Sequence, residues 1–266
     1  MHMTPFETAS RIEPTGDAGR FRAVIPDGWQ QGRGAFGGLV IGTLARAMLH
    51  SEPDAARVLR ALNAELCGPV LPGEAQLTVR VLRRGKGMST VEAHLDQGDA
   101  VLARASAILG ASRSTVTGSL SPPPPTQPPW SGVATASVEP PFGPVFAGHY
   151  EYRPVGPLPF SSSAEPVASG YVRAKQPQTR LDAPAILAYL DTYWPAYFSI
   201  VGMPSAMATV NYTAELLADP GALASDEPLF HTGRLIAHAG GFMVELRELW
   251  SGSLLVALNQ QTFAVI

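Results

Sequence analysis

The second half of this chain repeats the order of elements predicted for the first half. The first half gives a strand at 20–25, a helix at 39–50, and strands at 58–71, 74–83, 88–95 and 100–109. The second half gives a strand at 149–153, an extra strand at 171–174, a helix at 181–201, and strands at 206–217, 230–238, 242–250 and 254–266. Residues 98–103 (GDAVLA) and 252–257 (GSLLVA) keep the same spacing to their strands. This repeat predicts two copies of one α+β unit, with their sheets paired side by side so that fewer edges are exposed.

A proline-rich segment separates the two copies. Residues 119–144 include the run 122–125 and two further Pro-Pro pairs. Proline cannot donate to a strand ladder or continue a helix, so we predict an extended connector that Trp130 holds on the surface. A PxxP ligand for a partner domain is an alternative. The predicted domains are an N-terminal unit at 1–118, the connector at 119–144 and a C-terminal unit at 145–266.

The predicted helix at 181–201 is apolar on almost every face. Asp182 is suited to cap its start, and Pro184 falls in the first turn, where a missing N–H costs little. A helix of this kind should be wrapped by sheet. Pro195 lacks the N–H that would bond the carbonyl of Asp191, which predicts a kink at that point.

One carboxylate, that of Asp191, lies within this apolar helix. Asp191 shares a helix face with Leu187 and Trp194, so it should be buried. A buried carboxylate is costly unless it is neutralised or given hydrogen-bond donors. Asp191 is therefore either a functional residue or a core aspartate satisfied by a neighbouring threonine or by backbone. Burial should raise its pKa and hydrogen bonds should lower it, which leaves the direction open.

Composition narrows the class of protein. Hydrophobic residues make up 45% of the chain, enough for a substantial core. The net charge of −3 and the lack of a basic run argue against nucleic acid as a partner. The single cysteine, Cys67, excludes an internal disulfide and a Cys-rich zinc site. No membrane span or secretory signal is recognisable, so we expect a cytoplasmic protein.

Glycines precede the first predicted helix. Gly32, Gly34 and Gly37 match the dinucleotide-binding spacing literally, but no central parallel strand precedes them and no acidic strand end follows at the expected distance. Their better interpretation is that backbone approaches a ligand closely. At a helix N-terminus, free N–H groups and the helix dipole favour a carbonyl oxygen or an anion.

Three stretches of the chain together resemble one known family. They are FGGLVIGTLARAM at 36–48, PGEAQLTVRVLRRGKGMSTVEAHLDQGDAVLARASAIL at 72–109, and the late pattern YLD…ATVNYT…GSLLVALNQQ. They resemble bacterial acyl-CoA thioesterases of the type II, double hot-dog kind, over most of the chain except the N-terminus and the connector. The resemblance implies an antiparallel sheet wrapped around a long helix in each half, and hydrolysis of acyl-CoA thioesters. It also implies a catalytic trio of Asp191, Thr209 and Gln261.

Two members of this trio have rivals. Thr213 lies on the same strand face as Thr209 if the strand is regular. Strand alternation leaves both Gln260 and Gln261 open, and the spacing from the glycine turn favours Gln261. The first repeat has Ala107 where Gln261 would fall, and Ala45 or Arg46 where Asp191 would fall. We therefore expect one competent site per chain.

The chemistry expected of these groups is hydrolytic. Asp191 would accept the proton of a water that Thr209 and Gln261 orient. Backbone N–H groups of Gly37 and Gly38 would stabilise the oxyanion on the thioester carbonyl.

Other positions carry weaker expectations. Arg83, Arg84 and Lys86 could meet the phosphates of coenzyme A, or simply form a solvated hairpin end. There is no GxSxG motif, and the six histidines show no metal spacing, so we predict neither a metal nor a cofactor. A protein that binds acyl-CoA without hydrolysing it is the alternative, favoured by Asn211 where the family commonly has a second Asp. Pairing into a homo-oligomer, a dimer or a tetramer, is also possible.

Overall fold

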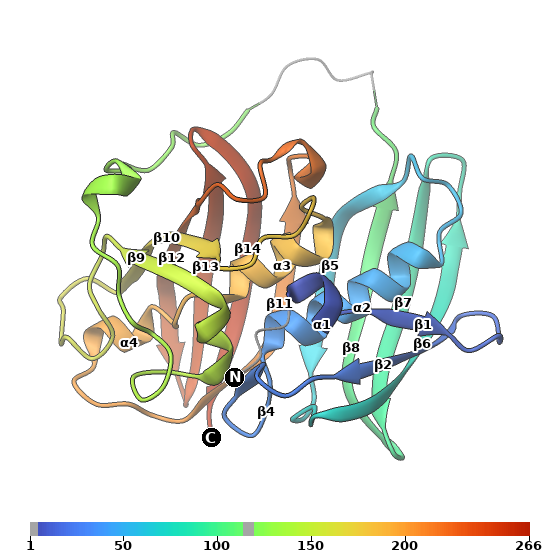
Figure 1. Cartoon of the computed structure of the whole chain (residues 1–266), viewed down its shortest axis with the longest axis horizontal. Helices are drawn as coiled ribbons and strands as arrows, with labels where there is room; N and C mark the ends of the chain where they lie inside the picture. The colour runs from blue at the N-terminus through green and yellow to red at the C-terminus, as the bar shows by residue number, and fades with distance from the viewer. Residues whose placement is uncertain (1–4, 114–119) are drawn as a thin grey trace.

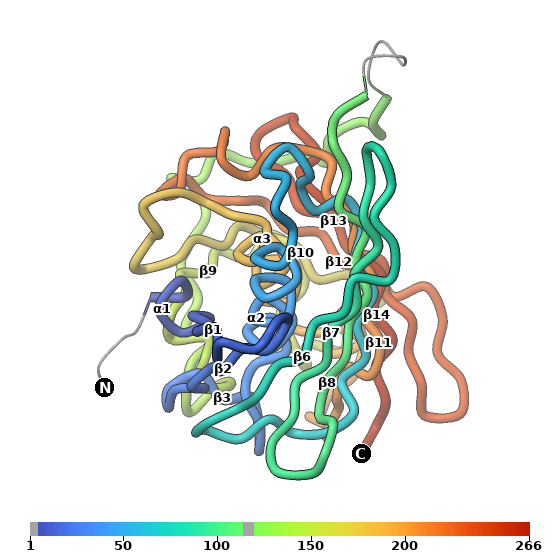
Figure 2. The backbone as a smooth tube through the Cα atoms, turned by 90° about the vertical axis from the view of Figure 1, so that its right-hand side faces the viewer, coloured from blue at the N-terminus to red at the C-terminus, as the bar shows by residue number. Residues whose placement is uncertain are grey.

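The structure, a computed structural model, describes residues 5–113 and 120–266. In these residues one antiparallel sheet of 12 strands curves around two helices, α2 and α3, which lie side by side on its inner face (Figures 1 and 2). The two halves of the chain stand next to each other in Figure 1, the N-terminal half in blue to green and the C-terminal half in yellow to red.

The elements of the N-terminal half are α1 (Phe6–Ala9), β1 (Ile12–Pro14), β2 (Arg20–Ile25), β3 (Gln30–Gln31), β4 (Gly34–Ala35), α2 (Gly37–His50), β5 (Val58–Leu66), β6 (Gly73–Arg84), β7 (Met88–Gln97) and β8 (Ala100–Gly110). Those that follow are β9 (Tyr150–Pro154), β10 (Val167–Ala174), α3 (Ala183–Asp191), α4 (Tyr197–Ile200), β11 (Met207–Leu216), β12 (Leu229–Ala239), β13 (Phe242–Ser251) and β14 (Leu254–Val265). Short 3-10 turns occur at Trp130–Gly132, Val145–His149 and Pro220–Ala222. β5 is shorter than predicted and ends at Leu66.

The strand order is nearly symmetric about its centre. It runs β1-β2-β6-β7-β8-β5-β11-β14-β13-β12-β10-β9, so the halves join where β5 pairs with β11. The predicted side-by-side pairing of the two sheets is confirmed. The sequence matched the strand at 149–153 (β9) with the strand at 20–25 (β2), and this was wrong. The counterpart of β2 is β10, because β10 lies next to β12 as β2 lies next to β6. β9 is an edge strand, in the place that β1 takes in the first half.

The pairing register of the second half also repeats that of the first. Gln261 of β14 lies opposite Tyr212 and Glu245, just as Ala107 of β8 lies opposite Leu62 and Val91. The strand that each half contributes to the central pair carries a bulge, at position 210 in β11 and at position 60 in β5. The two halves can therefore be compared position by position.

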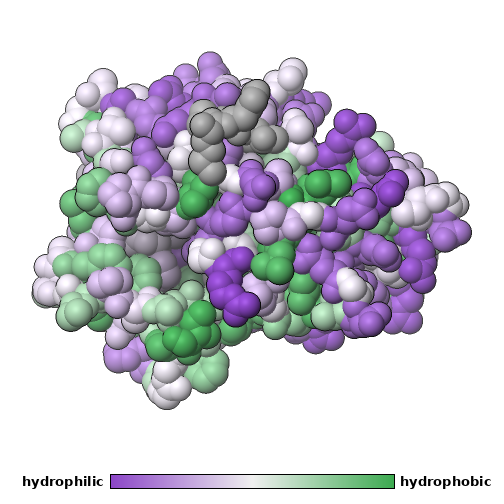
Figure 3. Space-filling model, turned by 60° about the horizontal axis from the view of Figure 1, so that its bottom comes forward, coloured by the Kyte–Doolittle hydropathy of each residue, from purple (hydrophilic) through white to green (hydrophobic). Residues whose placement is uncertain are grey.

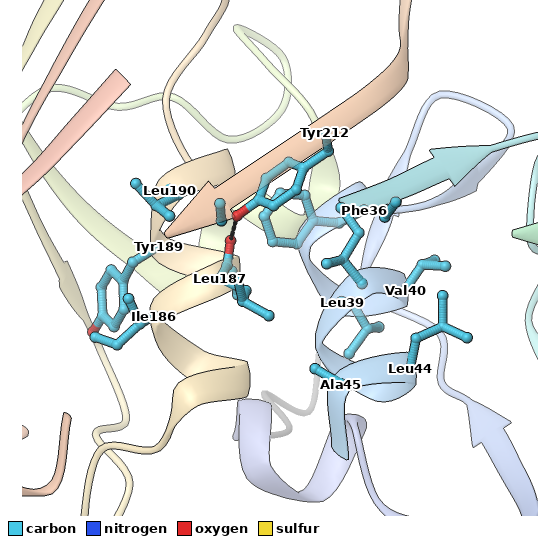
Figure 4. Packing of buried hydrophobic residues seen from close by; sticks show 14 of the residues in the cluster. Phe36, Leu39, Val40, Leu44, Ala45, Ile186, Leu187, Tyr189, Leu190 and Tyr212 are labelled. Atoms are coloured by element: carbon cyan, nitrogen blue, oxygen red, sulfur yellow. Dashed lines mark hydrogen bonds between the residues drawn. The ribbon is translucent and has the colours of Figure 1, made fainter. Parts of the chain in front are cut away.

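Helices α2 and α3 pack against each other in opposite directions. A Cβ on Gly38, near the start of α2, would lie 2.8 Å from Cα of Ala188, so only glycine allows this approach. Near the other end of α2, Nη1 of Arg46 lies 2.9 Å from Oδ2 of Asp182, which precedes α3. The C-terminus of α3, at Asp191, is consequently brought to the N-terminus of α2. Figure 4 shows the apolar side chains that fill the space around these helices.

The prediction of one long second helix was wrong. The carboxylate of Asp182 does cap α3, accepting from Ala185 N at 2.9 Å, but α3 ends at Asp191. A separate single turn, α4, forms only after Pro195. Because Pro195 has no N–H to bond the carbonyl of Asp191, the helix breaks rather than kinks.

Side chains from the sheet satisfy the carbonyls at the end of α3. The hydroxyl of Tyr212 donates to Leu187 O at 2.8 Å, the dashed line in Figure 4. Nη1 of Arg247 donates to Leu190 O at 2.9 Å, and the hydroxyl of Tyr152 to Thr192 O at 3.2 Å. Carbonyls at a helix end need partners when they are buried, so these bonds make the break stable.

The described part of the connector runs over the outside of the C-terminal half. The guanidinium of Arg153 lies 3.9 Å from the ring centroid of Trp130, and Tyr171 meets the same ring edge-on. The predicted role of Trp130 in holding the connector is thus confirmed.

The predicted domain boundary at 118 and 119 lies outside the described residues. Among the described helices, none combines the length and apolar character that crossing a bilayer needs.

Candidate active site

The structure brings Asp191, Thr209 and Gln261 together in one hydrogen-bonded chain. The Thr209 hydroxyl donates to Oε1 of Gln261 at 3.1 Å, and Nε2 of Gln261 donates to Oδ1 of Asp191 at 3.0 Å. Asp191 and Gln261 are buried, whereas Thr209 is only half-buried. The carboxylate is thereby held from inside, and Thr209 is the member of the chain nearest to solvent.

A β-bulge decides which threonine faces inward. The register of β11 against β14 shifts between Thr209 and Asn211, so one extra residue turns Thr209 toward the interior with its partner Phe263. Thr213 lies on the other side of the bulge and faces outward, where its hydroxyl lies 3.5 Å from Gln260 O. The expectation that Thr209 and Thr213 share a face was wrong, because it assumed a regular strand.

The amide of Gln261 is fixed by a fourth residue that sequence reasoning missed. Nε2 of Gln261 donates a second hydrogen bond to Oδ1 of Asn259 at 3.1 Å, and Nδ2 of Asn259 donates to Thr213 O at 2.6 Å. The Gln261 amide thus accepts one hydrogen bond through Oε1 and donates two through Nε2, and all three fit a single orientation of the amide. Gln260, by contrast, is exposed.

Gly37 and Gly38 form the first turn of α2 and lie against Asp191. The Gly38 N–H faces the carboxylate and lowers the pKa of Asp191. A Cβ on Gly37 would lie 2.8 Å from Oδ2 of Asp191. The positive end of the α2 dipole is therefore directed at the carboxylate. The Gly37 N–H has no partner among the backbone hydrogen bonds of the described chain.

Burial dominates the electrostatics of Asp191. It raises the pKa of Asp191 to about 6 from an ordinary value of 3.8. The Arg247 cation, the Gln261 amide and the Gly38 N–H lower the pKa, but together they offset burial only in part. A carboxyl group with a pKa near 6 is ionised at neutral pH and accepts a proton readily.

A buried ion pair behind Asp191 was also missed. Nε of Arg247 lies 3.0 Å from Oε1 of Glu245, and Nη1 of Arg247 lies 3.8 Å from Oδ1 of Asp191. Both side chains of the pair are almost fully buried, while Leu246 between them is exposed. No signal in the sequence marks this pair, because the sequence does not tell which face of β13 is inward.

Two models of protein families match the chain. A model described as the acyl-CoA thioesterase N-terminal domain matches residues 25–110, and one described as the acyl-CoA thioesterase C-terminal domain matches residues 120–265. The chain belongs to the acyl-CoA thioesterase family. As a member of this family it is a thioester hydrolase, and the resemblance found in the sequence is confirmed.

Solved structures share the hot-dog fold of this thioesterase. A conserved protein of unknown function with hot dog fold from Alicyclobacillus acidocaldarius has a TM-score of 0.89 at 21% identity, covering 100% of this chain and 99% of that one. A putative thioesterase II from Thermobifida fusca has a TM-score of 0.85 at 21% identity, covering 99% of each chain. The acyl-CoA thioesterase II TesB2 from Mycobacterium marinum has a TM-score of 0.75 at 16% identity, covering 98% of each chain. No curated protein sequence matches the chain.

The N-terminal half of the thioesterase has apolar residues at the positions equivalent to the trio and its buried polar neighbours. Strand registers and the seam between α2 and α3 identify the equivalent positions. The counterparts are Ala45 for Asp191, Leu59 for Thr209, Leu77 for His231, Val91 for Glu245, Ala93 for Arg247, Ala105 for Asn259 and Ala107 for Gln261, and all seven are buried. The same fold is thus built once without any of these buried polar groups.

The predicted phosphate-binding cluster lies away from Asp191. Arg83, Arg84 and Lys86 are exposed at the β6–β7 hairpin end, and Arg84 contacts Glu52 and the carbonyl of Ser51, just after the C-terminus of α2. The 14-residue helix α2 separates this hairpin from the carboxylate, a span of roughly 20 Å. The structure does not bring the cluster together with the trio.

The surface near the trio is partly apolar. Met207, at the start of β11, pairs with Val265, and the C-terminus lies on the lower side of the molecule in Figure 1. Figure 3 turns this side forward: apolar residues gather at the lower left, on the side of the C-terminal half, and polar residues dominate the right.

Within the described residues, no group of three or more His, Cys, Asp or Glu side chains is arranged as a metal site.

Proposed function

We propose that this chain hydrolyses acyl-CoA thioesters with a water molecule that Asp191 activates. The observation that carries the proposal is the hydrogen-bonded chain from Thr209 through Gln261 to Asp191, whose equivalent positions in the other half of the fold are all apolar. Burying polar groups costs stability, and the apolar residues at the equivalent positions of the first half indicate that the fold does not require polar groups there.

The hydrogen-bond directions suit a water held for attack. Thr209 uses its proton on Gln261, so its oxygen lone pairs remain available to accept from a water. Oδ1 of Asp191 accepts from Gln261, which leaves Oδ2 to accept the second proton of the same water. With both protons engaged, the water directs a lone pair at the thioester carbonyl, and Asp191 takes a proton as the new C–O bond forms.

The start of α2 supplies the stabilisation of negative charge. The Gly38 N–H is engaged by Asp191, so the Gly37 N–H is the donor that we assign to the carbonyl oxygen of the thioester. Removing one such donor in well-studied hydrolases costs about 3 kcal/mol of transition-state stabilisation. When the tetrahedral intermediate collapses, the C–S bond breaks and coenzyme A leaves as its thiolate.

One such site is proposed per chain. At the opposite end of the helix seam, the residues at the start of α3 are Asp182 as cap and Pro184, and Arg46 pairs with Asp182. Ala45, the counterpart of Asp191, offers no general base at that end, and Pro184 has no N–H. The two-unit division at 1–118 and 145–266, with a double hot-dog arrangement of two helix-and-sheet repeats, fits this view. A cytoplasmic location and a dimer or tetramer remain predictions.

A thiol-release assay tests the proposal. Purified protein is given short, medium and long acyl-CoAs, and the free thiol of coenzyme A is measured with a chromogenic disulfide. Asp191→Asn should lower kcat by about 100- to 10,000-fold, with binding of the same acyl-CoA retained in calorimetry. Thr213→Val, on the outer face of the same strand as Thr209, is the matched control and should keep full activity.

Two results would count against hydrolysis by this site. Tight binding of acyl-CoA with no thiol release by the native protein would favour the alternative, a protein that binds acyl-CoA without turnover. Thiol release that survives Asp191→Asn unchanged would place the chemistry elsewhere in the chain.

A further inference from the structure

Two buried charges lie directly behind Asp191 on strand β13. The side chains of Glu245 and Arg247 are 0% and 1% exposed. Arg247 bonds Oε1 of Glu245 through Nε and approaches Oδ1 of Asp191 to 3.8 Å through Nη1. Nη2 of Arg247 is buried without a hydrogen-bond partner in the described chain. These two residues are not part of the trio, and their burial needs a reason.

The sheet of the repeat does not by itself require these two charges. The counterparts of Glu245 and Arg247 in the first half are Val91 and Ala93, both buried, on a strand with the same register. A buried ion pair is often no more stabilising than apolar residues of similar volume, because both charges must be removed from water. At these two positions the second half therefore bears a desolvation cost that the first half avoids.

The contacts of the pair are placed on both sides of the helix break. Nη1 of Arg247 donates to Leu190 O, the last carbonyl before Asp191, at 2.9 Å. Oε2 of Glu245 accepts from Ala196 N, the first N–H after Pro195, at 2.7 Å. Since the two side chains are also bonded to each other, they tie the backbone before the break to the backbone after it.

We propose that Arg247 and Glu245 are positioning residues for Asp191: they fix the backbone on either side of it and set the charge against which its carboxylate ionises. This inference rests on the proposed function, in which Asp191 is the general base. Arg247 favours the ionised carboxylate, and Glu245, whose charge opposes it, limits that effect. The pair would thus keep the carboxylate ionised at neutral pH and still basic enough to take a proton.

The other titratable groups near Asp191 are uncharged at neutral pH. Burial keeps the pKa of Tyr212 on β11, and those of Tyr150 and Tyr152 on β9, well above 10. Burial also lowers the pKa of His231 on β12 well below 6.5; its ring stacks on Tyr193 and faces backbone carbonyls without a hydrogen bond of good geometry. The first turn of α2 contributes only backbone. Arg247 and Glu245 are therefore the charges, among the described residues, that act on Asp191.

The test measures two opposite shifts. Arg247→Met removes the attraction and should raise the pKa of Asp191 by about one unit, whereas Glu245→Gln removes the repulsion and should lower it. The acid limb of kcat/KM against pH should move with it, to higher pH in Arg247→Met and to lower pH in Glu245→Gln. Arg247→Lys keeps the charge but not the fork-shaped contacts, so kcat should fall while the acid limb stays in place.

A second readout is independent of activity. With 13C-labelled aspartate, the carboxyl resonance of Asp191, assigned by its loss in Asp191→Asn, is titrated in the intact protein without substrate. Glu248→Gln and Arg234→Met make the same charge changes on the outer face of β13 and β12, and should leave the titration unchanged. Glu245→Gln nearly preserves shape, so its result can be interpreted even where Arg247→Met does not fold.

The outcomes separate the two proposals. Opposite displacements of the Asp191 titration support the inference. Displacements in the same direction, or none, in folded variants overturn it, and the proposed function then stands on the thiol-release assay alone. If the two variants displace the Asp191 titration in opposite directions but the native protein releases no thiol, the charge coupling stands and the proposed function is wrong.

Discussion

Gln261 donates a 3.0 Å hydrogen bond from its amide Nε2 to Oδ1 of Asp191, although 70 positions separate the two residues in the chain. The same amide accepts from Thr209 and donates to Asn259. Gln261 is thus the hub through which an acid at the end of a helix is joined to a hydroxyl on a neighbouring strand. Its removal should separate them without emptying the core, since the first half has Ala107 at the same position.

Gln261→Ala should lower kcat by about 10- to 100-fold, which corresponds to losing a hydrogen bond to a charged group. Gln260→Ala, one residue earlier on the exposed face of β14, is the matched control and should leave kcat unchanged. Thiol release under saturating acyl-CoA measures both. Equal loss in the two variants would mean that the strand, and not the Asp191 contact, matters.

Activity should fall on the acid side of neutrality. The general base must be ionised, and burial raises the pKa of Asp191 to about 6. The logarithm of kcat/KM should therefore decline with unit slope below about pH 6 and be flat from pH 7 upward until another group titrates. A pH series with a short acyl-CoA measures this limb. A limb near pH 4 would indicate that hydrogen bonds outweigh burial at this carboxylate.

Asp191→Asn should stabilise the fold at alkaline pH. The pKa of Asp191 is higher in the folded chain than its ordinary 3.8, so the folded state binds more protons between the two values and loses stability as the pH rises through this window. At pH 8 the native protein carries the full penalty. The asparagine variant, which avoids it, should be more stable by about 1 to 3 kcal/mol.

This gain should shrink as the pH falls toward 4, because the native carboxyl group is then protonated in the fold. Urea unfolding of both proteins at pH 8, 6.5 and 5 gives the comparison. An asparagine variant that is less stable at pH 8 would mean that Arg247 stabilises the ionised carboxylate by more than burial costs.

Gly37→Ala and Gly38→Ala should fail in different ways. A Cβ on Gly37 would lie 2.8 Å from Oδ2 of Asp191 and should displace the carboxylate, so kcat should fall at least about tenfold with a small loss of stability. A Cβ on Gly38 would meet the ring of Phe36 at 2.5 Å and the backbone of Ala188 at 2.8 Å. Overpacking between two helices should cost about 1 to 3 kcal/mol of stability.

Thermal unfolding and thiol release on the same preparations separate the two effects. If Gly37→Ala kept full activity, Gly37 could not lie beside the catalytic carboxylate as described. If Gly38→Ala melted like the native protein, the close approach of α2 to α3 would be wrong.

Much of the fold could be predicted because local rules agreed with one another. The strands at 74–83 and 100–109 and the cap at Asp182 depend on patterns over a few residues, and each formed as predicted. The family resemblance then named three residues that these local rules do not distinguish from ordinary core and strand residues.

The rest depended on long-range contacts. The helix α3 ends where it does because of Pro195 and because side chains of β11 and β13 donate hydrogen bonds to its last carbonyls. The bulge in β11 has no mark in its composition, so Thr213 remained a rival to Thr209. Glu245 and Arg247 were not singled out in the sequence, because charged residues that alternate with a residue such as Leu246 are usually outside. Only the completed sheet shows that they face inward.

The bulge at position 210 has an equivalent at position 60, next to Leu59, in the half that lacks the trio and its polar neighbours. The main-chain shape that turns Thr209 inward therefore belongs to the repeat itself and did not arise with the chemistry. Along the strands, the N-terminal half has the same backbone with apolar side chains at the equivalent positions. Exchange of side chains, without any remodelling of the sheet, is therefore the direct route by which such a duplicated protein gains or loses an active site.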